Sequence, residues 1–197
     1  MKKVLYLTVI MIFTLVSVFG VIANAPADSV WNQDIEFDFI LEHEVSGIGA
    51  VGRLTVDIME FPSLLALYAP VSDIAGVEIF FSPERTNNEA NPGKFVFAFL
   101  APVGIQVPTA ESFSFIPTPG GIGAMDILKY GDVDGDGHVT SFDSTAVFDF
   151  ARGIVGSFSS RQLLAANVNG DGVITAFDAT AIFNVARGVG EFPILSR

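Results

Sequence analysis

A segment rich in Asp, Asn and Gly occurs twice near the C-terminus, and the second copy begins 35 residues after the first. The first copy reads DVDGDGHVTSFD (132–143) and the second reads NVNGDGVITAFD (167–178). The likeness continues beyond both segments, so that 132–153 and 167–188 are identical at 13 of 22 positions. Such self-similarity is typical of a duplicated structural unit. The sequence therefore predicts a C-terminal domain made of two related halves.

Oxygen-bearing side chains occupy alternate positions in each copy, which is what a calcium-binding loop requires. Calcium takes about six to eight oxygen ligands, and a glycine in mid-loop allows the sharp turn. We therefore expect two calcium ions, one in each loop, with Thr140 and Thr175 acting directly or through water. The predicted ligands are Asp132, Asp134, Asp136, the backbone carbonyl of His138, Thr140 and Asp143 in the first loop, and Asn167, Asn169, Asp171, the backbone carbonyl of Val173, Thr175 and Asp178 in the second.

The two loops differ in charge, because four of the ligands in the first loop are carboxylates and only two in the second, Asp171 and Asp178. Affinity for calcium rises with the charge of the ligands, so the first loop is expected to bind more tightly. Both loops close with Asp where the common EF-hand loop has Glu, so the following helix must lie nearer the ion. The alternative is a turn without metal, and two aligned copies with the same glycine and the same closing Asp disfavour it.

A helix is predicted after each loop, over 141–152 and 176–187, and Gly153 and Gly188 are expected to end them. A short linking helix is predicted over 159–166, capped by Ser159 or Ser160. One apolar face of each long helix should form the core; these faces consist of Val147, Phe150 and Ala151, and of Ile182, Val185 and Ala186. So small a core is marginal without metal, and we expect chelation to unfold it.

The duplicated loops resemble those of the type I dockerins over about 63 residues, 131–193. Each follows the pattern Asp/Asn-x-Asp/Asn-Gly-Asp-Gly-x-Val/Ile-Thr-x-x-Asp and leads directly into a helix. The resemblance implies a small all-α, EF-hand-like domain that folds on calcium and docks onto a cohesin-domain partner outside the cell, often in machinery that degrades polysaccharides. Tyr130 and Phe192-Pro193 look like the clasp that joins the ends of a dockerin.

The chain departs from cellulosomal dockerins at the positions that face the partner. Those dockerins have a Ser-Thr pair before the closing Asp and a Lys-Arg pair on the helix. This chain has Ser-Phe and Ala-Phe at the first pair of positions and Phe-Asp and Phe-Asn at the second. These differences favour a partner on a non-cellulosomal scaffold. Phe148 and Phe183 are either outward anchors or part of the core, and the near-symmetry of the two helices suggests two binding orientations. The expected partner-binding residues are Ser141, Phe142, Thr145, Phe148, Asp149 and Arg152, and Ala176, Phe177, Thr180, Phe183, Asn184 and Arg187.

The first residues have the layout of a secretory signal: a basic start, an apolar stretch over 4–23, and Ala-x-Ala patterns that end at Ala25 and Ala27. We expect residues 1–27 to be a signal peptide, after whose cleavage no membrane segment is left, and the alternative is an uncleaved membrane anchor. The chain has no Cys, which excludes disulfides and thiolate metal sites. Cleavage would remove Lys2 and Lys3 and change the net charge from −12 to −14, which argues against a nucleic-acid partner.

Residues 28–123 have the pattern of a β-rich domain, followed by a connector over 124–130. Apolar and polar residues alternate over several short segments, and turn-forming residues separate them. Such spacing predicts an all-β sandwich or small barrel. A helical turn or two is expected over 61–68, and a Pro/Gly-rich boundary occurs at 117–123. The predicted strands are 35–39, 54–58, 76–81, 94–99 and 112–116.

The pattern does not indicate catalysis, so no catalytic residue and no cofactor other than calcium is expected. The acidic residues of 28–123 are scattered, whereas a glycosidase needs two carboxyls at a fixed separation in a cleft. We interpret the chain as a secreted adaptor whose dockerin-like domain attaches a β-domain, with a carbohydrate or cell-surface ligand, to an extracellular complex. The alternatives are a structural cell-surface protein with a calcium-stabilised assembly module and a small glycoside-acting enzyme.

Overall fold

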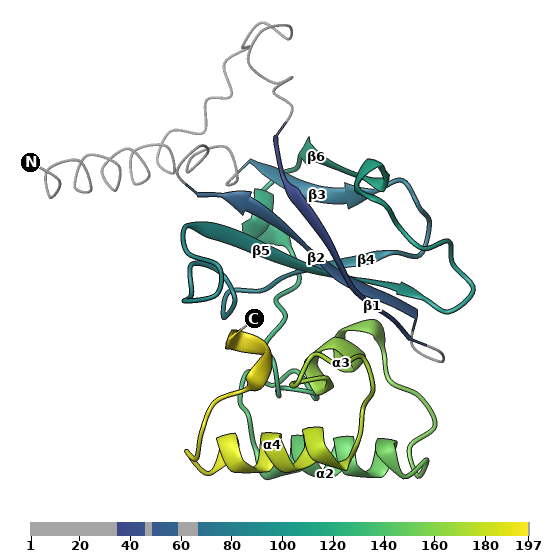
Figure 1. The fold of residues 1–197 in the computed structure, drawn as a ribbon, viewed down its shortest axis with the longest axis vertical. Helices are drawn as coiled ribbons and strands as arrows, with labels where there is room; N and C mark the ends of the chain where they lie inside the picture. Colours follow the sequence, from purple (N-terminus) through teal and green to yellow (C-terminus); the bar gives the residue numbers. More distant parts are fainter. Residues whose placement is uncertain (1–34, 46–48, 59–66, 197) are drawn as a thin grey trace, which may run out of the picture. The chain divides into compact units, whose positions relative to one another are not determined.

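The computed structural model describes residues 35–45, 49–58 and 67–196. The predicted signal peptide, 1–27, and most of the helical turns predicted at 61–68 lie outside these residues. These described residues form one compact unit. Within the described part of the chain, no helix has both the length and the apolar character to cross a bilayer. An all-β region is followed by a small helical region, which confirms the predicted fold class (Figure 1).

Two antiparallel sheets form the β region. The larger has the strand order β1-β2-β5-β4, built from β1 (Asp38–Val45), β2 (Gly49–Asp57), β5 (Lys94–Pro102) and β4 (Glu78–Phe81). In the smaller sheet, β3 (Tyr68–Ser72) pairs with β6 (Phe113–Pro117). Phenyl rings of both sheets meet: the ring centroids of Phe99 and Phe113 are 4.8 Å apart, and those of Phe97 and Phe115 are 5.6 Å apart. The β region is therefore a sandwich of two sheets.

Each predicted strand overlaps an observed one, but the bounds differ and one observed strand was not predicted. The second strand, for example, begins at Gly49 instead of residue 54. The first begins at Asp38 instead of residue 35 and continues to Val45, with a bulge between Leu41 and His43. Strand β3 was not predicted, and its first residue, Tyr68, fell in the helical turns expected over 61–68. Tyr68 is extended because it pairs with Pro117 of β6 and its ring lies buried between the sheets.

The larger sheet is apolar on both faces. Phe97 and Phe99 of β5 point into the sandwich, whereas Ala98 and Leu100, which alternate with them, point to the opposite face of the sheet. This other face, Val51, Phe80, Ala98 and Leu100, is called the helix-facing side of the sheet. It belongs to one buried cluster with Leu128, Tyr130 and Leu164 of the C-terminal region. Sheets covered on both faces have continuous apolar runs, which explains the sequence FVFAFLA at 95–101.

Three α-helices follow: α2 (Ser141–Ala151), α3 (Ser160–Ala166) and α4 (Ala176–Ala186). Figure 1 shows α2 and α4 next to each other, and they are in contact. All three predicted helices are confirmed, and their N-caps are Thr140, Ser159 and Thr175. Short 3-10 helices lie at Ala110–Ser112 (η1), Gly121–Ala124 (η2) and Pro193–Ser196 (η3).

The ends of the long helices agree with the prediction, and so do four of the six expected core residues. Gly153 and Gly188 have positive φ angles of 71° and 74°, the left-handed conformation that ends a helix without a Cβ penalty. Val147 and Ile182 are fully buried between the helices. The expected core position of Ala151 is wrong, because this last residue of α2 is exposed. Ala186 is half-buried and does not belong to the apolar cluster.

The segment between the β region and the first loop follows the edge of β4. The amide of Phe81 donates to the carbonyl of Asp126 at 3.0 Å, and the amide of Leu128 donates to the carbonyl of Phe81 at 2.8 Å. Ile127 forms a parallel bridge with Phe81 between these two bonds. The edge of the sheet is thereby covered by the residues that lead into the first loop.

Candidate metal centre and docking face

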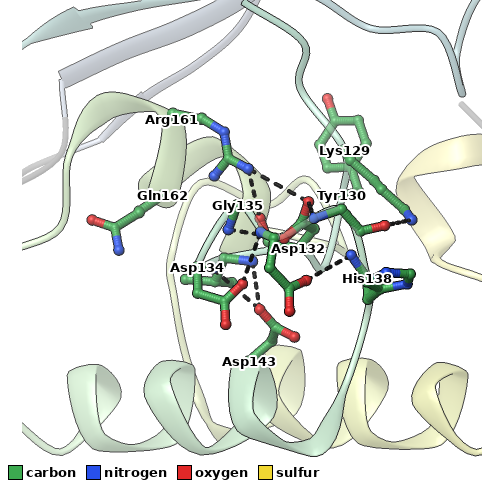
Figure 2. Close-up of polar contacts among 12 residues, drawn as sticks. Lys129, Tyr130, Asp132, Asp134, Gly135, His138, Asp143, Arg161 and Gln162 are labelled. Carbon is green, nitrogen blue, oxygen red and sulfur yellow. Dashed lines mark hydrogen bonds and ion pairs between the residues drawn. The ribbon is translucent and has the colours of Figure 1, made fainter.

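Three carboxylates gather in the first loop, where oxygens of Asp132, Asp134 and Asp136 all lie within 4.8 Å of one another. Backbone amides orient them. Asp132 accepts hydrogen bonds from the amides of Gly135 at 2.9 Å and Gly137 at 3.1 Å (Figure 2). Both glycines have positive φ angles, 83° and 88°, and these angles allow the turn that directs their amides toward Asp132. Three negative charges so close together repel unless a cation lies between them, and hard oxygen ligands suit calcium. The residues present therefore fit that ion.

The closing residue of the first loop, Asp143, is not part of this group of three. Its Oδ1 accepts from the amide of Val133 at 2.8 Å, and its Oδ2 accepts from the amide and the hydroxyl of Thr140 at 2.8 and 3.0 Å. Thr140 also caps α2 by accepting from the amide of Phe142 at 3.1 Å. The side chain of His138 is exposed, and its amide donates to Asp136 at 2.7 Å. The loop and the start of α2 are thus one hydrogen-bonded unit.

The second loop repeats this scaffold. Asp178 accepts from the amide and the hydroxyl of Thr175 at 2.9 and 3.1 Å, and Asp171 accepts from the amide of Val173 at 2.8 Å and from the side-chain amide of Asn169 at 2.7 Å. Burial raises the pKa of Asp178 above its usual value, although the hydrogen bonds from Thr175 and Asn169 oppose this. The capping boxes of the two loops are the same, and the predicted side-chain ligands differ only at the first and third positions of the loop.

One buried acceptor in the second loop has no protein partner. The Oδ1 atom of Asn167 is fully buried and accepts no hydrogen bond from any described residue. Leaving such a group unsatisfied costs about 1–3 kcal/mol, so natural structures normally supply a partner. Asn167 is the first predicted ligand of the second loop, and a bound cation would satisfy this oxygen. The observation supports metal binding by the loop that has fewer carboxylates.

Two basic side chains contact the first loop. Arg161 of α3 places Nη2 3.5 Å from Oδ2 of Asp132, and Lys129 donates to the carbonyl of Gly137 at 2.6 Å (Figure 2). Lys129 also lies near Glu84, whose pKa is raised by burial in spite of a hydrogen bond from the Tyr130 amide and the charge of Lys129. Neither contact was predicted from the sequence, because Lys129 and Arg161 lie outside the duplicated segments and belong to no motif.

Two of the residues expected to form the clasp, Tyr130 and Phe192, belong to one buried cluster, and Pro193 is half-buried. Phe192 packs over Gly131, where an added Cβ would come within 2.4 Å of its ring. The amide of Ile194 donates to the carbonyl of Val168 in the second loop at 3.0 Å. Tyr130 is buried in the same cluster, and its hydroxyl accepts from the guanidinium of Arg85 at 3.4 Å. The clasp therefore contacts the β region as well as the chain terminus.

Three glutamates of the β region have structural partners. Glu42 pairs with Arg85 at 2.8 Å and with Arg53 at 2.5 Å. Glu78 accepts from the hydroxyl of Ser160 at 2.8 Å, and Glu84 accepts from the amide of Tyr130 at 2.9 Å. These carboxylates connect the β region to the helices or neutralise buried cations.

The predicted partner-binding residues lie at the surface of α2 and α4. All are exposed except Asp149, which is half-buried. Phe148 is 42% exposed and Phe183 41%, so the alternative that they belong to the core is wrong. Arg152 lies over the ring of Phe148 at 5.4 Å, and Arg187 lies over Phe183 at 5.5 Å. These residues with Thr145 and Thr180 are called the docking face, and a groove of about 280 Å³ lies between its two halves.

Residues 130–184 match the family model of the dockerin type I domain. This segment is a type I dockerin domain. Dockerins of this type bind calcium and cohesins, so the predicted family and its ion agree with the geometry of the loops. The match begins at Tyr130, just after the residues 126–128 that pair with β4.

Two solved structures are similar to the dockerin part of the chain. Both are complexes of the third cohesin of ScaC with the ScaB dockerin of Acetivibrio cellulolyticus, one mutated in the C-terminal and one in the N-terminal dockerin helix. The first is 34% identical, covers 34% of this chain and 96% of its own, and has a TM-score of 0.33. The second is 35% identical, covers 36% of this chain and 99% of its own, and has a TM-score of 0.34. No curated protein gives a significant match.

Proposed function

We propose that the chain is a secreted, non-catalytic adaptor that docks onto a cohesin-domain partner through α2 and α4 and so attaches its β-domain to an extracellular complex. The observation that carries the proposal is the docking face, on which two helices present the same exposed side chains in the same surroundings. Exposed aromatic and arginine side chains dominate the binding energy of protein interfaces. A dockerin domain that displays them is suited to a cohesin surface.

Calcium is the structural cofactor of this adaptor, with one ion proposed in each loop. Each ion would be held by the six ligands predicted above for its loop. Asp132, Asp134 and Asp136 are already grouped in the first loop, and Asn167 offers an unpaired oxygen in the second. When bound, the ion supplies positive charge that holds the loop oxygens together. The protein itself positions these oxygens through the capping boxes of Thr140 and Thr175 and fixes the start of each helix.

The duplicated docking face supports two binding orientations related by a half turn. Phe148, Thr145 and Arg152 on α2 have equivalents in Phe183, Thr180 and Arg187 on α4. A partner that recognises one helix would therefore find the same side chains on the other after rotation. Apolar Phe148 and Phe183 also favour a cohesin with an apolar contact surface over one that recognises a Lys-Arg pair.

The test is binding of the full chain to cohesin domains encoded in the same genome, measured by calorimetry in calcium. We expect one of them to bind, and expect Phe148→Ala combined with Phe183→Ala to weaken binding at least about 30-fold, since hot-spot truncations cost about 2 kcal/mol or more. Each single variant should retain most of the affinity, because one intact helix remains. The matched control is Ile116→Ala, an exposed apolar residue on β6. A double variant that binds like the wild type would contradict the proposal.

The link to polysaccharide degradation is proposed from the dockerin family alone, and the β-domain is the part that the dockerin would deliver. An array of cell-wall polysaccharides and whole cells tests its role directly. Binding of the chain to a polysaccharide supports delivery of a carbohydrate-binding module, whereas binding to cells without any polysaccharide favours the structural cell-surface protein. Release of reducing sugar would show that the chain is an enzyme.

A further inference from the structure

Arg161 lies directly on the first loop, although it belongs to the linking helix α3. Its Nη2 is 3.5 Å from Oδ2 of Asp132 and donates to the backbone carbonyl of the same residue at 3.2 Å. The guanidinium also packs on Gly135, where an added Cβ would lie 2.9 Å from Nη2. The side chain of Arg161 is 24% exposed and that of Asp132 4%, so water screens the pair only in part.

The two halves of the dockerin differ at these two positions together. Thirty-five residues after Asp132 the second loop has the neutral Asn167, and 35 residues after Arg161 the chain has Ser196. The hydroxyl of Ser196 donates to the carbonyl of Pro193 at 2.8 Å within its own turn. The extra carboxylate and the guanidinium that faces it therefore occur in the same half, and neither has a charged equivalent in the other.

We propose that Arg161 is a positioning residue that weakens calcium binding at the first loop and brings the affinities of the two loops closer together than their carboxylates predict. The proposal rests on calcium binding by both loops, as proposed above. A cation that uses Asp132 must share this carboxylate with a guanidinium, and the guanidinium also repels a divalent ion through Coulomb interaction. The first loop has two carboxylates more than the second, Asp132 and Asp134. The charge of Arg161 offsets that of Asp132, so only Asp134 still favours calcium binding at the first loop.

Lys129 contributes less to this effect than Arg161. It contacts a backbone carbonyl of the loop, that of Gly137, and does not form an ion pair with any described carboxylate of the loop. Its charge also acts on the nearby Glu84. Arg161 is therefore the side chain whose replacement should change the affinity of the first loop selectively.

A purely structural role for Arg161 predicts the opposite sign. If the guanidinium only tied α3 to the loop, its removal would loosen the loop and weaken calcium binding. If it competes with the ion, its removal tightens binding. The direction of the change therefore separates the two roles.

The experiment titrates the full chain with calcium against a chelator of known affinity and follows the backbone amide resonances of Gly137 and Gly172, each of which reports on its own loop. We expect Arg161→Gln and Arg161→Met to tighten the first loop roughly five- to tenfold and to leave the second unchanged, since a charge removed near a divalent ion changes its binding by about this much. Arg161→Met keeps the aliphatic packing on Gly135, so agreement between the variants excludes a packing effect.

Two further variants complete the test. Arg161→Lys keeps the positive charge and should retain the wild-type affinity at both loops. Lys94→Gln removes a positive charge near Asp38 on the β region and should change neither loop. An unchanged or weaker first loop in Arg161→Gln and Arg161→Met would overturn the inference alone. Wild-type resonances that do not respond to calcium at either loop would overturn the proposed function together with the inference.

Discussion

Arg85 and Glu42 form an ion pair in the interior, with 2.8 Å between Nη2 and Oε1. The Arg85 side chain is completely buried, and its Nη1 donates a hydrogen bond to the hydroxyl of Tyr130 at 3.4 Å. Glu42 lies on β1 and Tyr130 immediately precedes the first loop, so this one guanidinium connects the β region to the dockerin. A buried charge without its partner is strongly destabilising, which makes the pair a sensitive point of the fold.

We therefore expect Glu42→Gln to lower the free energy of unfolding by about 3–5 kcal/mol, because it leaves the Arg85 guanidinium buried without a counterion. Chemical denaturation of the calcium-loaded chain measures the loss. The matched control is Asp38→Asn, which breaks the exposed pair between Asp38 and Lys94 and should cost at most about 1 kcal/mol. Equal losses in both variants would show that the interior pair has no special role.

The same pair should make stability depend on pH. Burial would raise the pKa of Glu42, but the guanidinium groups of Arg85 and Arg53 outweigh burial and hold the pKa below its usual value. A carboxyl whose pKa is lower in the folded state stabilises the fold above its unfolded pKa of about 4, and this contribution disappears as the pH falls through the folded pKa. The difference in unfolding free energy between the wild type and Glu42→Gln should therefore be constant from pH 7 to 5 and shrink below pH 4. A difference that does not change down to pH 2.5 would contradict this reading of the pair.

Removal of calcium should unfold the dockerin helices before the smaller sheet, β3 and β6. The loops fix the N-caps of α2 and α4, whereas β3 and β6 pack in the separate cluster inside the sandwich. With EDTA we expect hydrogen exchange to increase strongly over 132–188 and to change little in β3 and β6. Exchange that is unaffected by EDTA throughout 132–188 would argue against a structural ion.

The helix-facing side of the sheet should couple the two regions energetically. Leu100 is 1% exposed and belongs to the same cluster as Leu164 of α3. Leu100→Ala should cost about 2–5 kcal/mol and increase hydrogen exchange in α3 as well as in β5. The control, Val103→Ala, changes an exposed apolar residue just after β5 and should have an effect below about 0.5 kcal/mol. Normal protection of α3 in Leu100→Ala would show that the regions unfold independently.

Local signals allowed the dockerin to be predicted from the sequence. The glycines that end α2 and α4 and the spacing of oxygen ligands act within one loop and one helix, so their residues are close in the sequence. The outward position of Phe148 was left open, because a helix with apolar residues on several sides does not show which side is covered. The structure decides this through Val147 and Ile182, which fill the contact between the helices.

Contacts between distant segments could not be predicted in the same way. Arg161 and Asp132 are 29 residues apart, and the partners Arg85 and Tyr130 are 45 residues apart. Neither pair has a sequence pattern that identifies it. The unbroken apolar run at 95–101 did indicate that both faces of the larger sheet are covered. In a strand with one face in water, apolar and polar residues would alternate.

The pairing of Asp126 and Leu128 with Phe81 has a practical consequence for anyone who moves this dockerin to another protein. A cut at residue 130, where the family match starts, would strip the edge of β4 and uncover Val51, Phe80, Ala98 and Leu100 on the donor fragment. The donor fragment would then have an exposed apolar patch that favours aggregation. The excised dockerin would lack Leu128, which belongs to its buried cluster. A transplantable tag from this chain should therefore begin upstream of Asp126, and the apolar positions of α3 that lose the cover of the sheet should be redesigned as polar ones.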